Sequence, residues 1–117
     1  MEVLAKSADR NLLLELEGEL DHHAAKDAIC QIERAIDAAL PKKLVLDMER
    51  VTFMDSSGIG LIMGRYRLVR SLGGTLTVTG AGERLRAMLR LSGLDKLPIW
   101  ADTAKKERSK NDDTTDQ

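Results

Sequence analysis

The sequence predicts a single α/β domain, because segments with the pattern of a strand alternate with segments that have the pattern of a helix. A helix over about 57–72 lies between apolar strands at 44–46 and 75–79, the order of a βαβ unit with two parallel strands. A chain of 117 residues is long enough for one hydrophobic core and too short for two. Because the chain has one Trp, one Tyr and one Phe, we expect a mainly aliphatic core.

The N-terminal part predicts two strands and one helix. Residues 1–5 are short and apolar, which is typical of an edge strand. In the second half of 11–20, glutamates alternate with Leu or Gly, which predicts a strand with one solvated face. A helix over about 24–40 follows, with Asp21 as its N-cap and Pro41 as its stop. Its predicted inward stripe is Ala25, Ile29, Ile32, Ile36 and Ala39 or Leu40.

The central βαβ unit is bounded by clear signals. Residues 44–46 form an apolar run without polar alternation, which predicts a strand covered on both faces. The helix over 57–72 ends at Gly73-Gly74, where glycine suits a helix C-terminus. Its face with Gly60 and Gly64 predicts a close approach, for which we favour a neighbouring helix of the same domain over a partner protein.

The C-terminal part predicts a third helix over about 82–91 and a last short strand over 97–100, which Pro98 confines to an edge. From Lys105 onward the chain contains no apolar residue. We therefore divide it into a folded domain over 1–103 and a polar, disordered tail over 104–117 that is dispensable for folding.

Composition excludes several classes of function. A net charge of −1 provides no strong field for binding nucleic acid or anionic lipid. No apolar run approaches the ~20 residues of a membrane span, and no signal peptide opens the chain. The lone Cys30 excludes an internal disulfide. We expect a cytoplasmic protein with no direct contact to nucleic acid or membrane.

The motif with the clearest chemistry is Met54-Asp55-Ser56-Ser57-Gly58, at the junction of a strand and a helix. A helix N-terminus favours a hydroxyl cap and tolerates an added phosphate, because its N–H groups are unpaired. Simple capping is one interpretation of the motif, and a modified serine is the other. A hydrolase is disfavoured, because Met54 occupies the first glycine position of the G-x-S-x-G elbow.

Other catalytic and cofactor sites are weakly supported. Asp21-His22-His23 is a weak candidate for a metal site, since adjacent residues point in different directions and the chain has one Cys. The same two histidines are the only candidates for a base beside a nucleophilic serine. Gly80-Ala81-Gly82 lacks the third glycine of a dinucleotide turn, and no Walker lysine is present. We expect no cofactor, no metal and no enzymatic activity.

Five segments in register over about residues 1–100 carry a resemblance to a known family. They are Gly18-Glu19-Leu20-Asp21-His22-His23, Phe53-Met54-Asp55-Ser56-Ser57-Gly58-Ile59-Gly60, Gly64-Arg65-Tyr66, Gly73-Gly74 and Ser92-Gly93-Leu94. On these segments the chain resembles the STAS-domain family, and within it the sporulation antagonists of anti-sigma factors. The resemblance implies a four- to five-stranded mixed sheet with helices packed mainly on one face.

The resemblance also implies a function. An unphosphorylated antagonist binds an anti-sigma factor that is a serine kinase, and so releases the sporulation sigma factor. The kinase phosphorylates Ser56, and a metal-dependent serine phosphatase reverses this step. The docking surface that the resemblance implies comprises Asp21, His22, His23, Asp55, Ser57 and Gly58. Two alternatives stay open: an antagonist in a general stress-response pathway, and a STAS sensor of a small ligand or lipid.

Overall fold

Four strands and three helices make up the part of the chain that the structure, a computed structural model, describes, residues 1–101. The elements are β1 (Glu2–Ala8), β2 (Asn11–Leu20), α1 (His22–Ala39), β3 (Lys43–Met54), α2 (Ser56–Ser71), β4 (Thr75–Thr79), α3 (Glu83–Leu91) and a short 3-10 helix, η1 (Leu94–Lys96). The predicted tail over 104–117 lies outside the described residues, and its disorder stays a prediction.

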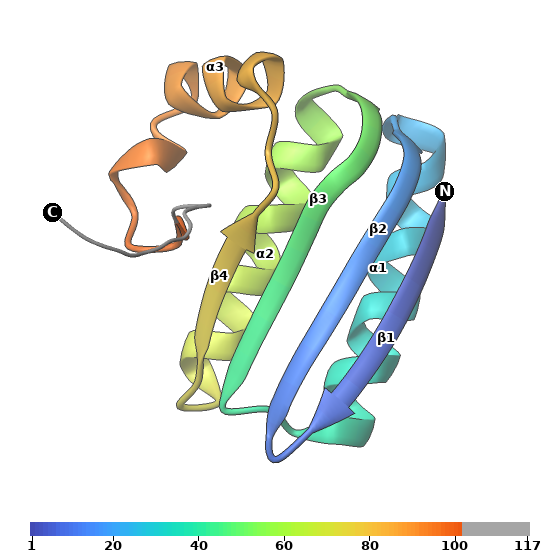
Figure 1. Cartoon of the computed structure of the whole chain (residues 1–117), viewed down its shortest axis with the longest axis vertical. Helices are drawn as coiled ribbons and strands as arrows, with labels where there is room; N and C mark the ends of the chain where they lie inside the picture. The colour runs from blue at the N-terminus through green and yellow to red at the C-terminus, as the bar shows by residue number, and fades with distance from the viewer. Residues whose placement is uncertain (102–117) are drawn as a thin grey trace, which may run out of the picture.

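The sheet has the strand order β1-β2-β3-β4, which is also the order of the strands along the chain. β1 pairs with β2 antiparallel, whereas β2 with β3 and β3 with β4 are parallel pairs. The predicted βαβ unit is therefore confirmed as β3-α2-β4. Helices α1 and α2 lie on one face of this mixed sheet, and α3 lies beyond the end of β4 (Figure 1).

The predicted strand over 97–100 is wrong in extent. That segment forms a single parallel bridge, between Val78 and Trp100, and η1 precedes it. Pro98 supplies no N–H for a ladder, which explains why pairing does not extend. Ile99 nevertheless reaches the core, where it is 1% exposed.

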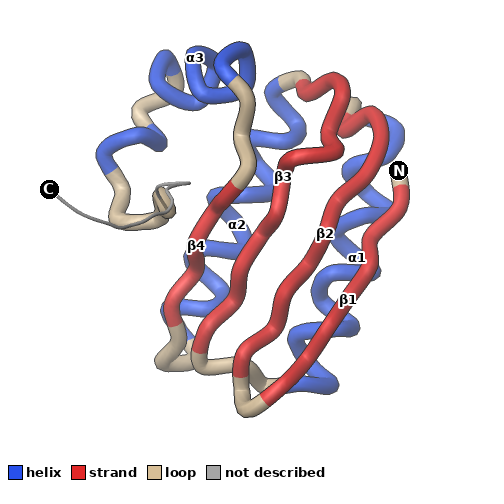
Figure 2. The backbone as a smooth tube through the Cα atoms, in the orientation of Figure 1, coloured by secondary structure: helices blue, strands red, loops and turns tan. Residues whose placement is uncertain are grey.

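The prediction for 44–46 is also wrong, in both length and coverage. β3 runs over twelve residues, Lys43–Met54. Leu44 and Leu46 are fully buried, but Val45 between them and Asp47 after them are only half-buried. The reason is that the long helices cover a single face of the sheet, as the tube in Figure 2 shows.

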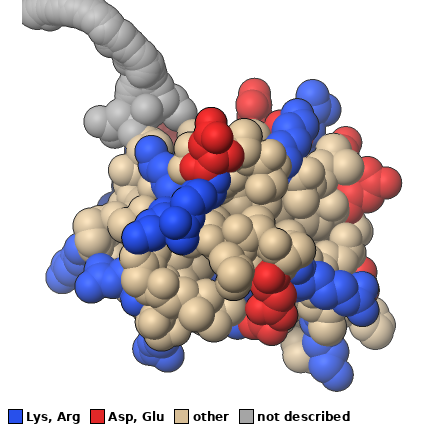
Figure 3. Space-filling view, turned by 90° about the horizontal axis from the view of Figure 1, so that it is seen from below, with Lys and Arg blue, Asp and Glu red and all other residues tan. Residues whose placement is uncertain are grey.

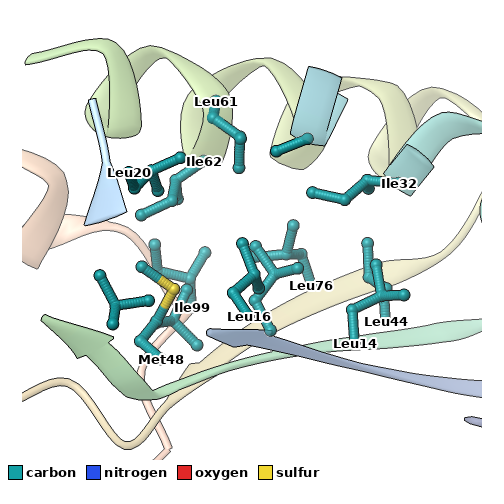
Figure 4. Packing of buried hydrophobic residues seen from close by; sticks show 14 of the residues in the cluster. Leu14, Leu16, Leu20, Ile32, Leu44, Met48, Leu61, Ile62, Leu76 and Ile99 are labelled. Atoms are coloured by element: carbon teal, nitrogen blue, oxygen red, sulfur yellow. The ribbon is translucent and has the colours of Figure 1, made fainter. Parts of the chain in front are cut away.

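The core lies between this face and the helices (Figure 4). Every second residue of β2 from Leu12 to Leu16 is buried, so the predicted alternation begins earlier than expected. Side chains of α1 and α2 face those of the sheet. The buried hydrophobic residues are Leu12, Leu14, Leu16, Leu20, Ala25, Ala28, Ile32, Ile36, Leu44, Leu46, Met48, Val51, Met54, Leu61, Ile62, Val69, Leu76, Val78, Leu89, Leu94 and Ile99.

The glycines of α2 do not serve the role predicted for them. A Cβ added at Gly60 or Gly64 would meet nothing within 4 Å, so no helix of residues 1–101 packs on that face. The close approach occurs instead at Gly58, at the start of the same helix. The close approach predicted at Gly60 and Gly64 is therefore wrong for the helices of the described domain.

One ion pair joins the two long helices. Arg65 of α2 donates to Glu33 of α1 at 3.2 Å, and the two side chains are 12% and 43% exposed. Within residues 1–101, Nε and Nη1 of Arg65 are buried and have no hydrogen-bond partner. Glu33 is thus the acceptor that compensates a largely buried guanidinium.

Replacing Glu33 by Ala is expected to lower the free energy of unfolding by about 1–2 kcal/mol, because it leaves the Arg65 charge unpaired. Chemical denaturation measures this loss. Lys6→Ala is the matched control, since the Lys6–Glu15 pair is on the surface and its lysine side chain is 68% exposed. We expect that control to change stability by less than ~1 kcal/mol. Equal losses in the two variants would contradict a special role for the Arg65 pair.

Charge is spread without a dominant patch at the end of the molecule seen from below. Figure 3 shows basic and acidic side chains interspersed there, with uncharged surface between them. Within residues 1–101, none of the helices combines the length and the apolar character that a membrane crossing requires.

Candidate functional site

The Asp-Ser-Ser-Gly turn joins β3 to α2. Asp55 is the N-cap of α2, because its Oδ1 accepts the N–H of Ser57 at 2.8 Å. The carbonyl of Asp55 accepts the N–H of Gly58 at 3.0 Å. The helix consequently begins at Ser56, one residue earlier than the sequence predicted. Ser56 is exposed and Ser57 is half-buried, so the two hydroxyls occupy different environments.

A second helix begins beside this turn. Asp21 is the N-cap of α1, as predicted, and its Oδ1 accepts the N–H of Ala24 at 2.8 Å. The helix starts at His22, two residues before its predicted start. His22 and His23 are exposed in its first turn.

The parallel pairing of β2 and β3 brings the two helix starts together. Leu20 at the end of β2 is in register with Met54 at the end of β3. The helices that follow these two strands therefore begin at the same end of the sheet. Asp55 then connects them: its Oδ2 accepts the N–H of His22 at 3.0 Å, and its own N–H donates to the carbonyl of Leu20 at 3.3 Å. The Asp21-His22-His23 segment and the serine turn therefore form one surface.

His22 also contacts the second serine of the turn. Its Nδ1 lies 3.3 Å from the Oγ of Ser57. A serine beside an imidazole is the start of a nucleophile–base pair, but a triad also needs a group that orients the ring. Asp55 accepts the backbone N–H of His22, not a ring N–H, so it does not supply that group. The contact with His22 therefore orients the Ser57 hydroxyl more than it activates this hydroxyl as a nucleophile.

The electrostatics of the turn centre on Asp55, whose carboxyl has a pKa below its ordinary value of 3.8. The N–H of Ser57 lowers the pKa most, and burial opposes this by raising it. The N–H of His22, the hydroxyl of Ser57 and the positive charge of His22 lower it further. Each of these groups stabilises the carboxylate, so the turn is held by an ionised Asp55 at neutral pH.

The lowered pKa of Asp55 predicts how stability depends on pH. A carboxyl whose pKa is depressed by folding stabilises the fold above its unfolded pKa, and this contribution is lost as the pH falls through the folded pKa. We therefore expect wild type to be more stable than Asp55→Asn above about pH 5. The gap in unfolding free energy between the two proteins should close as the pH falls below 3.8. Urea denaturation at a series of pH values measures it, and a gap that widens on acidification would contradict the assignment.

Gly58 supports this surface from beneath. It is buried, and a Cβ at this position would lie 2.2 Å from Cγ and 2.6 Å from Sδ of Met54, and 3.1 Å from Cδ2 of Leu20. Glycine lets the first turn of α2 sit directly on the ends of β2 and β3. The packing shows that Gly58 positions the neighbouring serines, and its part in docking stays a prediction.

Phe53 is a candidate that sequence reasoning missed as a site residue. It immediately precedes the turn residues Met54 and Asp55, and it is 47% exposed although it is large and apolar. Together with residues of α3 it borders a hollow of about 130 Å³, lined by Thr52, Phe53, Met54, Arg84, Leu85 and Met88. In the sequence, Phe53 is the one Phe of the chain and begins a segment that carries the family resemblance, but neither fact gave it a role.

Comparison with known proteins gives the family. The family model of the STAS domain matches residues 2–108. The chain belongs to the STAS-domain family. Among curated STAS-domain relatives, it is 39% identical over 90 residues to an anti-sigma F factor antagonist of Paenibacillus polymyxa, covering 76% of this chain and 77% of the relative.

Two further STAS-domain relatives differ in the sigma pathway that their names state. An anti-sigma F factor antagonist of Lysinibacillus sphaericus is 34% identical over 83 residues, covering 71% of each chain. An anti-sigma-B factor antagonist of Bacillus subtilis (strain 168) is 26% identical over 93 residues, covering 76% of this chain and 80% of the relative. Identity is thus higher to the sigma F antagonists.

Solved structures show the same STAS fold. The anti-sigma factor antagonist SpoIIAA in its unphosphorylated form superposes with a TM-score of 0.68 at 28% identity, covering 88% of this chain and 90% of that one. The Bacillus cell fate determinant SpoIIAA in its phosphorylated form gives a TM-score of 0.69 at 31% identity, covering 90% and 93%. The predicted STAS architecture, with a four-stranded mixed sheet, is confirmed.

Proposed function

We propose that this chain is an anti-sigma factor antagonist that is switched by phosphorylation of Ser56. In this proposal the unphosphorylated form binds an anti-sigma factor with serine kinase activity, and thereby releases a sporulation sigma factor. The observation that carries the proposal is the exposed Ser56 at the first position of α2, on one surface with Asp21, His22 and His23. The names of the sigma F antagonists, and a SpoIIAA structure described as phosphorylated, support it.

The geometry explains how a phosphate would end binding without unfolding the antagonist. A phosphate adds about −1.5 to −2 charge and three acceptor oxygens. At the N-terminus of α2 the helix dipole stabilises this charge. A partner surface that fits a neutral hydroxyl instead meets repulsion and a desolvation cost, with the carboxylate of Asp55 adjacent. The hydrogen bonds of Asp55 hold the turn in place from beneath, so the switch changes the interface and not the fold.

The proposal assigns further partners by their chemistry. A metal-dependent serine phosphatase removes the phosphate and restores binding. The chain itself is a regulator in the cytoplasm, and neither an enzyme nor a ligand of nucleic acid or membrane. A sporulation pathway is preferred to general stress response, because identity is 39% to a sigma F antagonist and 26% to a sigma-B antagonist. A lipid or small-ligand sensor is disfavoured, because aliphatic side chains fill the space between helices and sheet (Figure 4).

The proposal is tested with the anti-sigma F factor of Paenibacillus polymyxa, the target stated in the name of the first relative. Wild type should bind it, then dissociate during incubation with Mg-ATP, and phosphopeptide mapping should place the phosphate on Ser56. Ser56→Ala should bind equally well and remain bound. Ser57→Ala should remain a substrate. Phosphate on Ser57 of wild type, or no binding at all, would overturn the proposal.

The exposed Phe53, beside the hollow bordered by α3, predicts a further contact with the partner. We expect Phe53→Ala to weaken binding of the anti-sigma factor by about 1–2 kcal/mol, about 5- to 30-fold, because a partly exposed aromatic residue beside a hollow is typical of an interface anchor. Leu4→Ala is the matched control, because Leu4 is 51% exposed but lies on β1 at the far edge of the sheet. Titration calorimetry measures both, and a loss as large in Leu4→Ala would show that Phe53 has no special role.

A further inference from the structure

The structure distinguishes two serines that the sequence leaves equivalent. Ser57 is held at two atoms: its N–H donates to Asp55 at 2.8 Å, and its Oγ lies 3.3 Å from Nδ1 of His22. Ser56 is exposed, and its side chain takes part in none of the hydrogen bonds found within residues 1–101.

The partner of Ser57 is itself fixed. The N–H of His22 donates to Asp55 at 3.0 Å, in the first turn of α1. The backbone N–H groups of His22 and Ser57 therefore donate to the same carboxylate, and this fixes the position from which the imidazole extends. This arrangement turns the second hydroxyl toward α1, whereas the first hydroxyl is left free on the surface.

Resting on the proposed function, we propose that His22 is a positioning residue that determines which serine accepts the phosphate. It acts through Ser57: by holding the Ser57 hydroxyl toward α1, it withholds that hydroxyl from the kinase and leaves Ser56 as the acceptor. The role needs only the imidazole Nδ1, not the charge of the ring.

The chemistry of the transfer shows why this orientation matters. The serine Oγ forms a bond to the γ-phosphorus of ATP while the bond from that phosphorus to the β,γ-bridging oxygen breaks, and ADP leaves. The hydroxyl proton passes to a base of the kinase. The Oγ must point at the phosphorus, in line with the leaving oxygen. A Ser57 hydroxyl bonded to His22 has to break that contact first.

The size of the effect follows from the contact that must break. A neutral hydrogen bond contributes a modest net free energy, which corresponds to about a 2- to 10-fold change in the rate of transfer to Ser57. The effect is measured best where Ser56 cannot compete. Ser56→Ala therefore serves as the background for the His22 variants.

The experiment follows phosphate on each serine by mass spectrometry, with the Paenibacillus polymyxa anti-sigma F factor and Mg-ATP. Four proteins are compared: wild type, Ser56→Ala, Ser56→Ala with His22→Ala, and Ser56→Ala with His22→Asn. Circular dichroism establishes that each one is folded. We expect phosphate on Ser56 of wild type, and a rate at Ser57 about 2- to 10-fold higher with His22→Ala than in Ser56→Ala alone. Asn places an amide atom near the position of Nδ1, so His22→Asn should restore the low rate.

The outcomes separate this inference from the proposed function. If wild type is phosphorylated on Ser56 but His22→Ala leaves the rate at Ser57 unchanged, the role of His22 is overturned and the proposed function stands. A rate that rises equally in His22→Asn and His22→Ala also overturns it, because the nitrogen then has no part. If wild type accepts phosphate on neither serine, the proposed function fails and this inference fails with it.

Discussion

Ser56→Asp is expected to fold normally and to bind the anti-sigma factor at least about 30-fold more weakly than wild type, a loss of about 2 kcal/mol or more. An acid at the first position of α2 suits the helix dipole, so thermal stability should not fall. The loss arises at the interface, where a fixed charge replaces a neutral exposed hydroxyl. Calorimetric titration measures it, and a higher salt concentration should reduce it.

Ser56→Asn is the control that separates charge from size. Asparagine has nearly the shape of aspartate but carries no charge, so it should bind substantially more tightly than Ser56→Asp. Equal weakening in the two variants would mean that bulk at this position blocks docking. Full-strength binding by Ser56→Asp would contradict the electrostatic switch.

Gly58→Ala is expected to cost about 2–3 kcal/mol of unfolding free energy, which lowers the melting temperature by about 10–20 °C. The added Cβ would lie 2.2 Å from Cγ of Met54. Met54 is 3% exposed and cannot swing into solvent without opening the core under the turn. Calorimetry or thermal circular dichroism measures the shift.

Gly60→Ala is the matched control, two residues further along the same helix. Nothing lies within 4 Å of an added Cβ there, so the substitution should raise stability by up to ~1 kcal/mol through helix propensity. A loss of stability in Gly60→Ala, or none in Gly58→Ala, would show that the packing around the turn is not as described.

The sequence predicted some strands well, because their patterns are local. β2 and β4 have the predicted ends, since alternation and bounding glycines mark them. The predicted ends of β3 are wrong, because its pairing with β2 is irregular. From the pair Glu15–Asp47 to the pair Glu17–Arg50, β2 advances by two residues and β3 by three. A second shift follows, between Gly18 and Glu19. Two extra residues break the alternation of β3, so its second half lacks the period that identifies a strand.

The site was predictable in part for the same reason. The cap of α1, Asp21, follows from residue type and place in the sequence, whereas the hydroxyl cap predicted for α2 is wrong, because the carboxylate of Asp55 caps that helix. The different environments of Ser56 and Ser57 do not follow in this way, because the Ser57 hydroxyl contacts His22, which is 35 residues away in the sequence. Likewise Gly60 and Gly64 resemble a packing motif in sequence, and only the absence of a helix against them in residues 1–101 shows otherwise.

The strand order of the sheet has a consequence for how the domain is made. Because the order along the chain is the order in space, every strand pairs with the one synthesised just before it. A chain emerging from the ribosome can add each strand to an existing edge, with no pairing postponed until a distant segment appears. Loop closure is then short at each step, which favours rapid folding. The serine turn is complete once β2, β3 and the start of α2 have assembled, before β4 is in place.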